Sequence, residues 1–261
     1  MNKEIAFRRD SSHKVYNYKK WLQIINEFTG KNVIDQKESM KIEKKDLDEW
    51  WWNKHYKDFS RYSSWQYLYA ALNCFVEYSR WNVIVGLENL ESWDLIKEID
   101  SVVDVGAGIG LSTMLLADSL PWADVHYNNI PSIQVDFFKK HKHQRIKLSS
   151  ERDLVKHGPF DLILASEYFE HFEEPIKQLE FLQNEVGFKI MIVSNSFTAK
   201  SYGHFKSYII EGREYEPRQM SAIFNSVLEG PDYDRPKVAK SWNLHPQIFI
   251  RRNNDSNRNK L

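Results

Sequence analysis

The chain has 261 residues, which is enough for one large domain or a catalytic core with an appendage, and for a substantial buried core. Its 36 Lys and Arg residues balance its 36 Asp and Glu residues, so no overall field favours a nucleic acid or an acidic membrane as partner. The single cysteine, Cys74, excludes an internal disulfide and a cysteine metal cluster.

The N-terminal third is rich in aromatic residues, and its pattern from about residue 15 to residue 95 predicts helices. Ser64 is a candidate N-cap, and apolar residues follow it at helical spacing. The preceding segment, 46–62, carries aromatic residues on more than one face. This pattern fits either packing between helices or an aromatic lid that faces a ligand. The first ten residues lack an apolar signal core and no stretch reaches membrane-spanning length, so we expect a cytoplasmic protein without membrane contact.

From Ile99 onward the pattern alternates between strand and helix, which is typical of βαβ units and a mostly parallel sheet. The predicted strands are Ser101–Val105, Asp124–Tyr127, Arg145–Leu148, Asp161–Ala165, Lys189–Val193, Val238–Trp242 and Gln247–Arg251. The predicted helices are Leu111–Ser119, Ser132–Lys140, Pro175–Val186 and Pro217–Leu228. Only four residues join the last two strands, which is too few for a parallel crossover and predicts an antiparallel hairpin.

A glycine-rich turn follows the first predicted strand. Asp104 is followed by Gly106, Gly108 and Gly110, which leave the backbone bare where the strand turns into a helix. Glycine suits such a turn because a ligand can approach the backbone closely and because positive φ angles are allowed. A dinucleotide-binding fingerprint would place its third glycine at position 111, which is Leu.

This turn, the segment Phe160–Pro175 and the closing hairpin resemble class I S-adenosylmethionine (SAM) methyltransferases over Ile99–Arg252. The resemblance implies an α/β fold, with a seven-stranded, mostly parallel Rossmann-like sheet that ends in an antiparallel C-terminal hairpin. It also implies three parts: an aromatic-rich helical extension or lid (1–95), the methyltransferase core (96–252) and a disordered tail (253–261).

The resemblance further implies the residues that bind SAM. In the family the glycine loop wraps the methionine part of SAM, and an acid after the second strand binds the ribose. Asn129 occupies that second position here, and as a neutral partner it should bind the ribose more weakly than a carboxylate. No acid corresponds to the usual adenine contact after the third strand. The implied cofactor-binding residues are Asp104, Gly106, Gly108, Gly110, Asn129, Ser150 and Ser166.

Two carboxylates and an imidazole follow the fourth predicted strand. Glu167, Glu170 and His171 have the spacing that places side chains on one face of a helical turn. The pattern resembles the metal site of small-RNA 3′-terminal 2′-O-methyltransferases and of ubiquinone-pathway O-methyltransferases. In the RNA group a further His after the fifth strand completes the site, and His204 occupies that place here. The resemblance implies Mg²⁺ or Mn²⁺ held by these four residues. Metal-free members also carry a Glu-His in this turn, so both interpretations stay open.

The leading functional hypothesis is SAM-dependent methylation of a hydroxyl on a small molecule or sugar. The sulfonium of SAM already makes the methyl group electrophilic, so the protein must align donor and acceptor and remove the acceptor's proton. The candidate catalytic residues are His171, His204 and Glu167. A first alternative is an RNA or nucleotide methyltransferase of the 2′-O type, supported by the same four residues, Glu167, Glu170, His171 and His204, and by the basic run Lys139–Arg145. A second is a non-catalytic partner protein that keeps the fold and docks through its aromatic helices.

Overall fold

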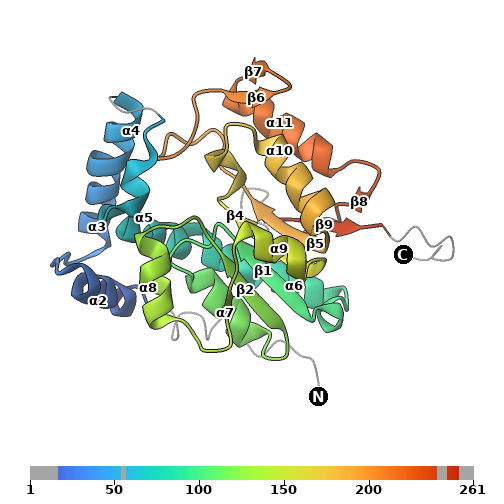
Figure 1. The fold of residues 1–261 in the computed structure, drawn as a ribbon, viewed down its shortest axis with the longest axis horizontal. Coiled ribbons are helices and arrows are strands. Elements are labelled where there is room, and N and C mark those ends of the chain that lie inside the picture. The colour runs from blue at the N-terminus through green and yellow to red at the C-terminus, as the bar shows by residue number, and fades with distance from the viewer. Residues whose placement is uncertain (1–16, 54–56, 240–245, 253–261) are drawn as a thin grey trace.

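The structure is a computed structural model that describes residues 17–53, 57–239 and 246–252. A seven-stranded sheet with the order β3-β2-β1-β4-β5-β9-β8 forms its centre (Figure 1). Within this sheet, only the pairs β5–β9 and β8–β9 are antiparallel. The strands are β1 (Ser101–Val105), β2 (Asp124–Asn128), β3 (Lys147–Leu148), β4 (Phe160–Ser166), β5 (Phe188–Ser194), β8 (Tyr233–Asp234) and β9 (Gln247–Arg251), with a separate hairpin of β6 (Tyr208–Ile210) and β7 (Arg213–Tyr215). The seven-stranded, mostly parallel Rossmann-like sheet that the sequence predicts, with antiparallel strands at its C-terminal end, is confirmed.

Helices lie on both faces of the sheet and form a further group at the N-terminus. They are α2 (Tyr18–Thr29), α3 (Gln36–Ile42), α4 (Glu49–Asn53), α5 (Gln66–Cys74), α6 (Arg80–Ser92), α7 (Leu111–Ser119), α8 (Ile133–His141), α9 (Glu151–His157), α10 (Pro175–Glu180) and α11 (Pro217–Leu228). Two short 3₁₀ turns, Phe59–Ser63 and Phe169–His171, lie next to the cavity described below. The candidate lid is therefore a set of packed helices.

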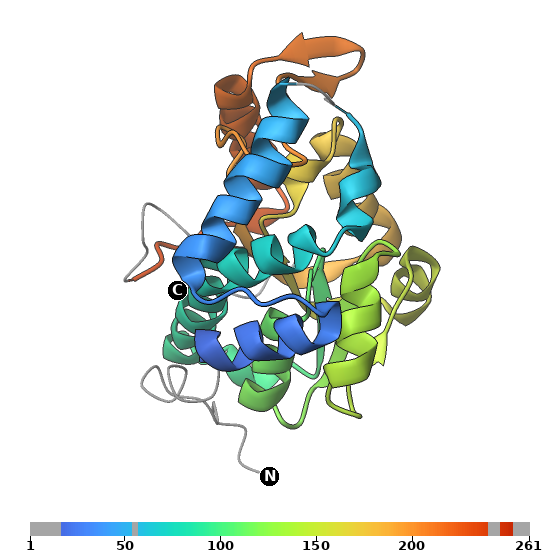
Figure 2. The ribbon, with the colours of Figure 1, turned by 90° about the vertical axis from the view of Figure 1, so that its left-hand side faces the viewer.

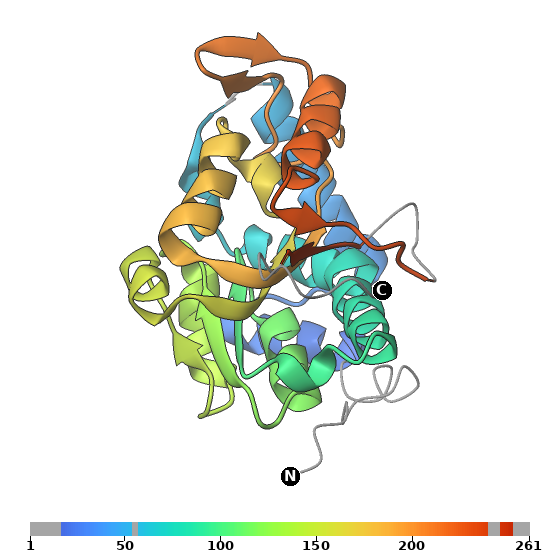
Figure 3. The same cartoon turned by 90° about the vertical axis from the view of Figure 1, so that its right-hand side faces the viewer.

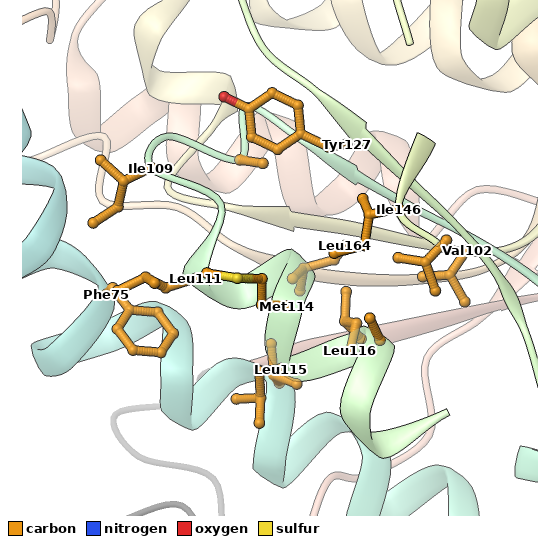
Figure 4. Close-up of a cluster of buried hydrophobic side chains, with 14 of the residues drawn as sticks. Phe75, Val102, Ile109, Leu111, Met114, Leu115, Leu116, Tyr127, Ile146 and Leu164 are labelled. Carbon is orange, nitrogen blue, oxygen red and sulfur yellow. The ribbon is translucent and has the colours of Figure 1, made fainter. Parts of the chain in front are cut away.

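Alternate residues of the strands enter two separate hydrophobic cores. Val102 and Leu162 belong to the core under α6, α7 and α8, part of which Figure 4 shows. Their neighbours Val103 and Ile163 belong to the core under α9, α10 and α11. Strands that are buried on both faces carry continuous apolar runs, which is why the sequence signal for β1 and β4 was strong.

The N-terminal helices share their apolar residues with the sheet. Trp21 and Ile25 of α2 are buried in the same core as β1, and the Trp21 ring packs edge-on against Phe137 of α8. α2 and α3 pack on α5, and α5 in turn packs on α8 (Figure 2). α6 lies directly on β5 and α7. The division of the chain between residues 95 and 96 stays a prediction.

The partner of the last strand differs from the prediction. β9 pairs with Tyr233–Asp234, as Figure 3 shows, and not with Val238–Trp242. Val238 and Ala239 are in no strand, and residues 240–242 lie outside the described part. The cause is a contact with α6. The Asn89 side chain accepts from the Ala239 backbone N–H at 2.8 Å and donates to the Ala239 carbonyl at 3.1 Å. Those backbone groups are therefore satisfied by α6 and not by a strand.

Two other elements were absent from the predicted set: α9 and the β6–β7 hairpin. The predicted helix Pro175–Val186 is observed as α10, followed by a π-helical turn over Phe181–Val186. The predicted tail 253–261 lies outside the described residues. Within the described part of the chain, none of the helices has the length and apolar character needed to cross a bilayer.

Substitution of Gly110 tests the packing of the glycine loop. Its φ is +77°, and an added Cβ would overlap the ring of Phe138. Gly110→Ala should therefore lower the free energy of unfolding by about 2–4 kcal/mol, the sum of overpacking and backbone strain. Urea denaturation measures this loss.

Gly30→Ala is the matched control, because Gly30 has a φ of +67° and no atom within 4 Å of an added Cβ. It should cost only the backbone term, about 1 kcal/mol. Equal losses in the two variants would show that contact with Phe138 is not the constraint.

Candidate functional site

A cavity of about 290 Å³ lies at the carboxyl ends of β1 and β4. The strand order reverses there, since β1 has β2 on one side and β4 on the other. Open α/β sheets bind ligands in the crevice at such a reversal. The volume is near the lower end of the range for small-molecule pockets, about 300–1,000 Å³. The glycine loop borders the cavity from one side, and residues that follow β4 and β5 border it from another.

The glycine loop presents bare backbone to this cavity at Gly108. Its φ is +56°, and the nearest atoms to an added Cβ would be Ala71 Cβ at 3.7 Å and Gln134 Nε2 at 3.9 Å. Gly106 and Gly110 also have positive φ, but there an added Cβ would overlap a ring, of Tyr168 or Phe138 respectively. An added Cβ at Gly108 would therefore make only ordinary van der Waals contacts, and Gly108 is the one of these three glycines where no ring fills the place of the side chain.

Asp104 is buried at the end of β1 and borders the cavity. Its carboxylate accepts hydrogen bonds from Ser112 Oγ at 2.6 Å and Thr113 Oγ1 at 2.7 Å, both on the first turn of α7. Burial raises the pKa of Asp104 to about 6, although both hydroxyls oppose the shift. Asp104 thus joins β1 to α7 and holds the glycine loop between them.

Three other predicted cofactor residues have different environments. The Asn129 amide donates to Gly108 O at 3.3 Å and to Gln134 Oε1 at 2.9 Å, so it supports the glycine loop. Ser150 is exposed and caps α9. Ser166 borders the cavity and accepts from Asn82 Nδ2 at 2.7 Å. Neither Asn129 nor Ser150 borders the cavity, and their roles in cofactor binding stay predictions.

The two carboxyl groups after β4 lie close together and share Ser196. Glu167 has a φ of +52°, a conformation that costs a non-glycine residue on the order of 1–3 kcal/mol and is typical of functional sites. Ser196 Oγ contacts Glu167 Oε2 and lies 3.0 Å from Glu170 Oε1, which also accepts from Ser196 N at 2.8 Å. Glu170 is fully buried and its Oε2 has no partner. Burial, and then the charge of Glu167, raise the pKa of Glu170 well above its usual value.

The structure brings the two predicted imidazoles together. The rings of His171 and His204 are perpendicular, with centroids 4.9 Å apart. His204 Nδ1 lies 3.0 Å from Ala199 O, and because a carbonyl only accepts, Nδ1 carries the proton and Nε2 does not. Burial lowers the pKa of His204 to about 4. Burial also lowers the pKa of His171 well below its usual value, with a further contribution from His204. Both rings are therefore neutral at pH 7.

The arrangement does not fit a metal ion as the side chains lie. A shared cation requires ligand atoms at about 2.0–2.5 Å from one point. Among the residues that the structure describes, no three or more His, Cys, Asp or Glu side chains are placed to do this. The carboxyl groups of Glu167 and Glu170 are bonded to serine hydroxyl and backbone groups. We therefore derive no chemical step through a cation.

Residues of the N-terminal helices hold the loop that carries His204, and sequence analysis missed these contacts. Trp51 Nε1 donates to His204 O at 2.7 Å, and Trp52 Nε1 donates to Ser201 O at 3.0 Å. Asp48 accepts from the backbone N–H of Tyr202 at 2.8 Å. The dense aromatic run of 46–62 was the available signal. This run predicted either helix packing or a lid over a ligand. In the structure Trp51 and Trp52 pack among other aromatic rings and also bind the loop that carries His204.

Comparisons with known proteins give structural likeness alone. No protein-family model and no curated protein matches the sequence. The plantazolicin methyltransferase BpumL, solved with SAH (the demethylated form of SAM), is 19% identical with a TM-score of 0.40. That match covers 61% of this chain and 60% of BpumL, so this chain spans less than two thirds of that protein. The methyltransferase domain of bacterial CtHen1 is 15% identical with a TM-score of 0.43, over 65% and 96% of the two chains.

The buried carboxyl of Asp48, which binds the loop that carries His204, should make the stability of the protein depend on pH. Burial raises the pKa of Asp48 from 3.8 to about 7. Between these values the folded state binds more protons than the unfolded state, so stability falls as the pH rises from about 4 to about 7. Asp48→Asn keeps an acceptor oxygen for Tyr202 and should flatten this slope in urea denaturation.

The expected difference in pH slope between Asp48→Asn and the wild type vanishes well below pH 4, because Asp48 is then uncharged in the folded and in the unfolded protein. Glu49→Gln removes the exposed neighbouring carboxylate and serves as the control. Identical slopes for the wild type and Asp48→Asn would contradict the assignment.

Proposed function

We propose that the protein is a SAM-dependent methyltransferase that acts on a hydroxyl group of a small molecule or sugar. The observation that carries this proposal is the composition of one cavity. One wall is the bare backbone at Gly108, and another carries the neutral imidazoles of His171 and His204. Gly108 borders the cavity and no ring packs on its backbone, which fits a ligand that approaches the backbone closely, as the methionine part of SAM does in the resembling family.

The residues of the chain supply the two things that methyl transfer from SAM requires. SAM supplies a methyl group that its sulfonium already makes electrophilic. The glycine loop and the facing wall align donor and acceptor, which removes much of the entropic barrier. The His171–His204 pair accepts the proton of the hydroxyl, since both rings are neutral and His204 Nε2 is unprotonated. Glu167, on the same wall, stabilises the positive charge that the ring then carries.

The charges around the cavity favour a neutral acceptor over RNA or a nucleotide. No described residue that borders the cavity is Lys or Arg, and the acidic residues Glu77 and Glu167 do border it. Phosphate groups are held by cationic side chains, which such a wall lacks. The basic run Lys139–Arg145 is partly engaged elsewhere, because Arg145 donates to backbone carbonyls of the segment 120–123. These contacts support the small-molecule or sugar acceptor.

Calorimetry with SAM and SAH tests the cofactor assignment. Gly108→Val places a branched side chain on the cavity side of the loop, so the affinity should fall at least about tenfold, or about 1.4 kcal/mol. The fold should survive, because the nearest atom to an added Cβ is 3.7 Å away.

Gly212→Val is the control for backbone strain. Gly212 has a φ of +77°, has no atom within 4 Å of an added Cβ and lies between β6 and β7, outside the cavity lining. It should bind SAH like the wild type. Unchanged SAH affinity in folded Gly108→Val would remove the assignment.

A metal titration tests the remaining part of the sequence resemblance. Because the four predicted ligands do not surround a common point, we expect no saturable binding of Mn²⁺ or Mg²⁺. SAH affinity should be the same with EDTA and with added Mn²⁺. One Mn²⁺ bound per chain in the wild type, and lost in His204→Ala, would be the contrary result and would restore the metal hypothesis.

A further inference from the structure

Tyr62 belongs to the N-terminal helical segment, yet its hydroxyl reaches a predicted catalytic residue. It lies on the 3₁₀ turn Phe59–Ser63 and is 8% exposed. Its ring packs edge-on against Tyr67, with centroids 4.6 Å apart, and also contacts Tyr202. Its Oη lies 2.9 Å from His171 Nδ1, across 109 residues of sequence. Packing on several sides therefore fixes the position of this hydroxyl.

Gly203 makes room for this hydrogen bond. Its φ is +83°, and an added Cβ would lie 2.6 Å from His171 Nδ1 and would overlap Tyr62 Oη. The Gly203 backbone also hydrogen-bonds the ring and raises the pKa of His171, opposing the effect of burial. The space filled by Tyr62 and His171 thus requires glycine at position 203.

We propose that Tyr62 is a positioning residue for the methyl transfer: its hydroxyl holds His171 Nδ1, so that the ring presents an unprotonated Nε2 to the acceptor. This proposal rests on the proposed function. In this arrangement Tyr62 Oη accepts the Nδ1 proton, and because a neutral imidazole carries one proton, Nε2 is unprotonated. The Ala199 carbonyl does the same for His204. Both rings therefore offer an unprotonated Nε2, and His171 and His204 both border the cavity.

The chemistry of tyrosine suits this place better than that of a carboxylate. Burial raises the pKa of the Tyr62 hydroxyl, so it stays neutral. A carboxylate at this position would favour the protonated ring and would hold His171 as an imidazolium, which cannot accept a proton. A neutral hydroxyl fixes the ring and leaves it basic. On this account the N-terminal segment contributes directly to the geometry of the site.

The test uses NMR of the full chain with ¹⁵N-labelled histidine and needs no ligand. In the wild type, His171 should show a protonated Nδ1 and an unprotonated Nε2. Tyr62→Phe keeps the ring and removes the hydroxyl, so the Nδ1 resonance should shift and broaden. Tyr69→Phe is the matched control, because it removes a buried tyrosine hydroxyl that bonds to Asn26 and not to the cavity. It should leave the His171 resonances unchanged.

A second variant, Gly203→Ala, tests the same contact if Tyr62→Phe does not fold. Gly203→Ala should displace Tyr62 from His171 and give the same Nδ1 shift as Tyr62→Phe. Resonances of His171 that are unchanged in either folded variant would overturn the proposal, as would a wild-type His171 protonated on Nε2.

An SAH titration separates this proposal from the proposed function. Tyr62 does not border the cavity, so Tyr62→Phe should bind SAH within about twofold of the wild type. With a hydroxyl acceptor, kcat should fall and its pH profile should shift, while the KM for SAM stays constant. A wild type that binds no SAH would end the proposed function and leave the NMR result intact. A Tyr62→Phe enzyme with unchanged kcat and pH profile would end the positioning role alone.

Discussion

The rest of the site depends on a backbone loop that must adopt left-handed angles while large side chains close around it. The three glycines that follow Asp104 have φ values of +65°, +56° and +77°. Tyr168, after β4, packs where Gly106 lacks a side chain, and Phe138 of α8 packs in the same way on Gly110. Tyr127 Oη donates to Gly108 O at 2.7 Å. The loop is thus held from β2, α8 and the turn after β4, and its middle glycine remains open.

The same turn after β4 connects the loop to the carboxyl and imidazole groups. Glu167 and Tyr168 are adjacent in sequence, and Glu167 has a positive φ. The Glu167 side chain borders the cavity, and the Tyr168 ring packs against Gly106 of the loop. The N-terminal helices close the opposite side, since Trp51 and Trp52 bind carbonyls of the loop that carries His204. Residues 48–52 and 201–204 are therefore joined by three hydrogen bonds.

The sequence predicted those parts of the fold that local patterns determine. The bounds of β1, α7, α11 and β9 match the prediction, because apolar runs end there at glycine or begin at proline. β8 was misplaced, because a two-residue strand has no pattern and the Asn89–Ala239 contact joins residues 150 positions apart. Tyr62 was missed for the same reason, since its role depends on His171 and Gly203. The pairing of His171 with His204 was predictable from the resemblance, and the sharing of Ser196 by Glu167 and Glu170 was not.

Five buried titratable groups in or beside the cavity have pKa values shifted toward their neutral forms. Burial raises the pKa of Asp104, Asp48 and Glu170 and lowers that of both imidazoles. A poorly solvated cavity has this effect, because it disfavours any charge that has no partner. The proposed reaction would move one positive charge from the sulfonium to an imidazole and would create no new charge. A cavity with little solvation and an acidic wall suits such a transfer, because Glu167 lies where it attracts the positive charge as it reaches the ring. The same wall would repel an anionic acceptor, so the charges that would assist catalysis also select a neutral substrate.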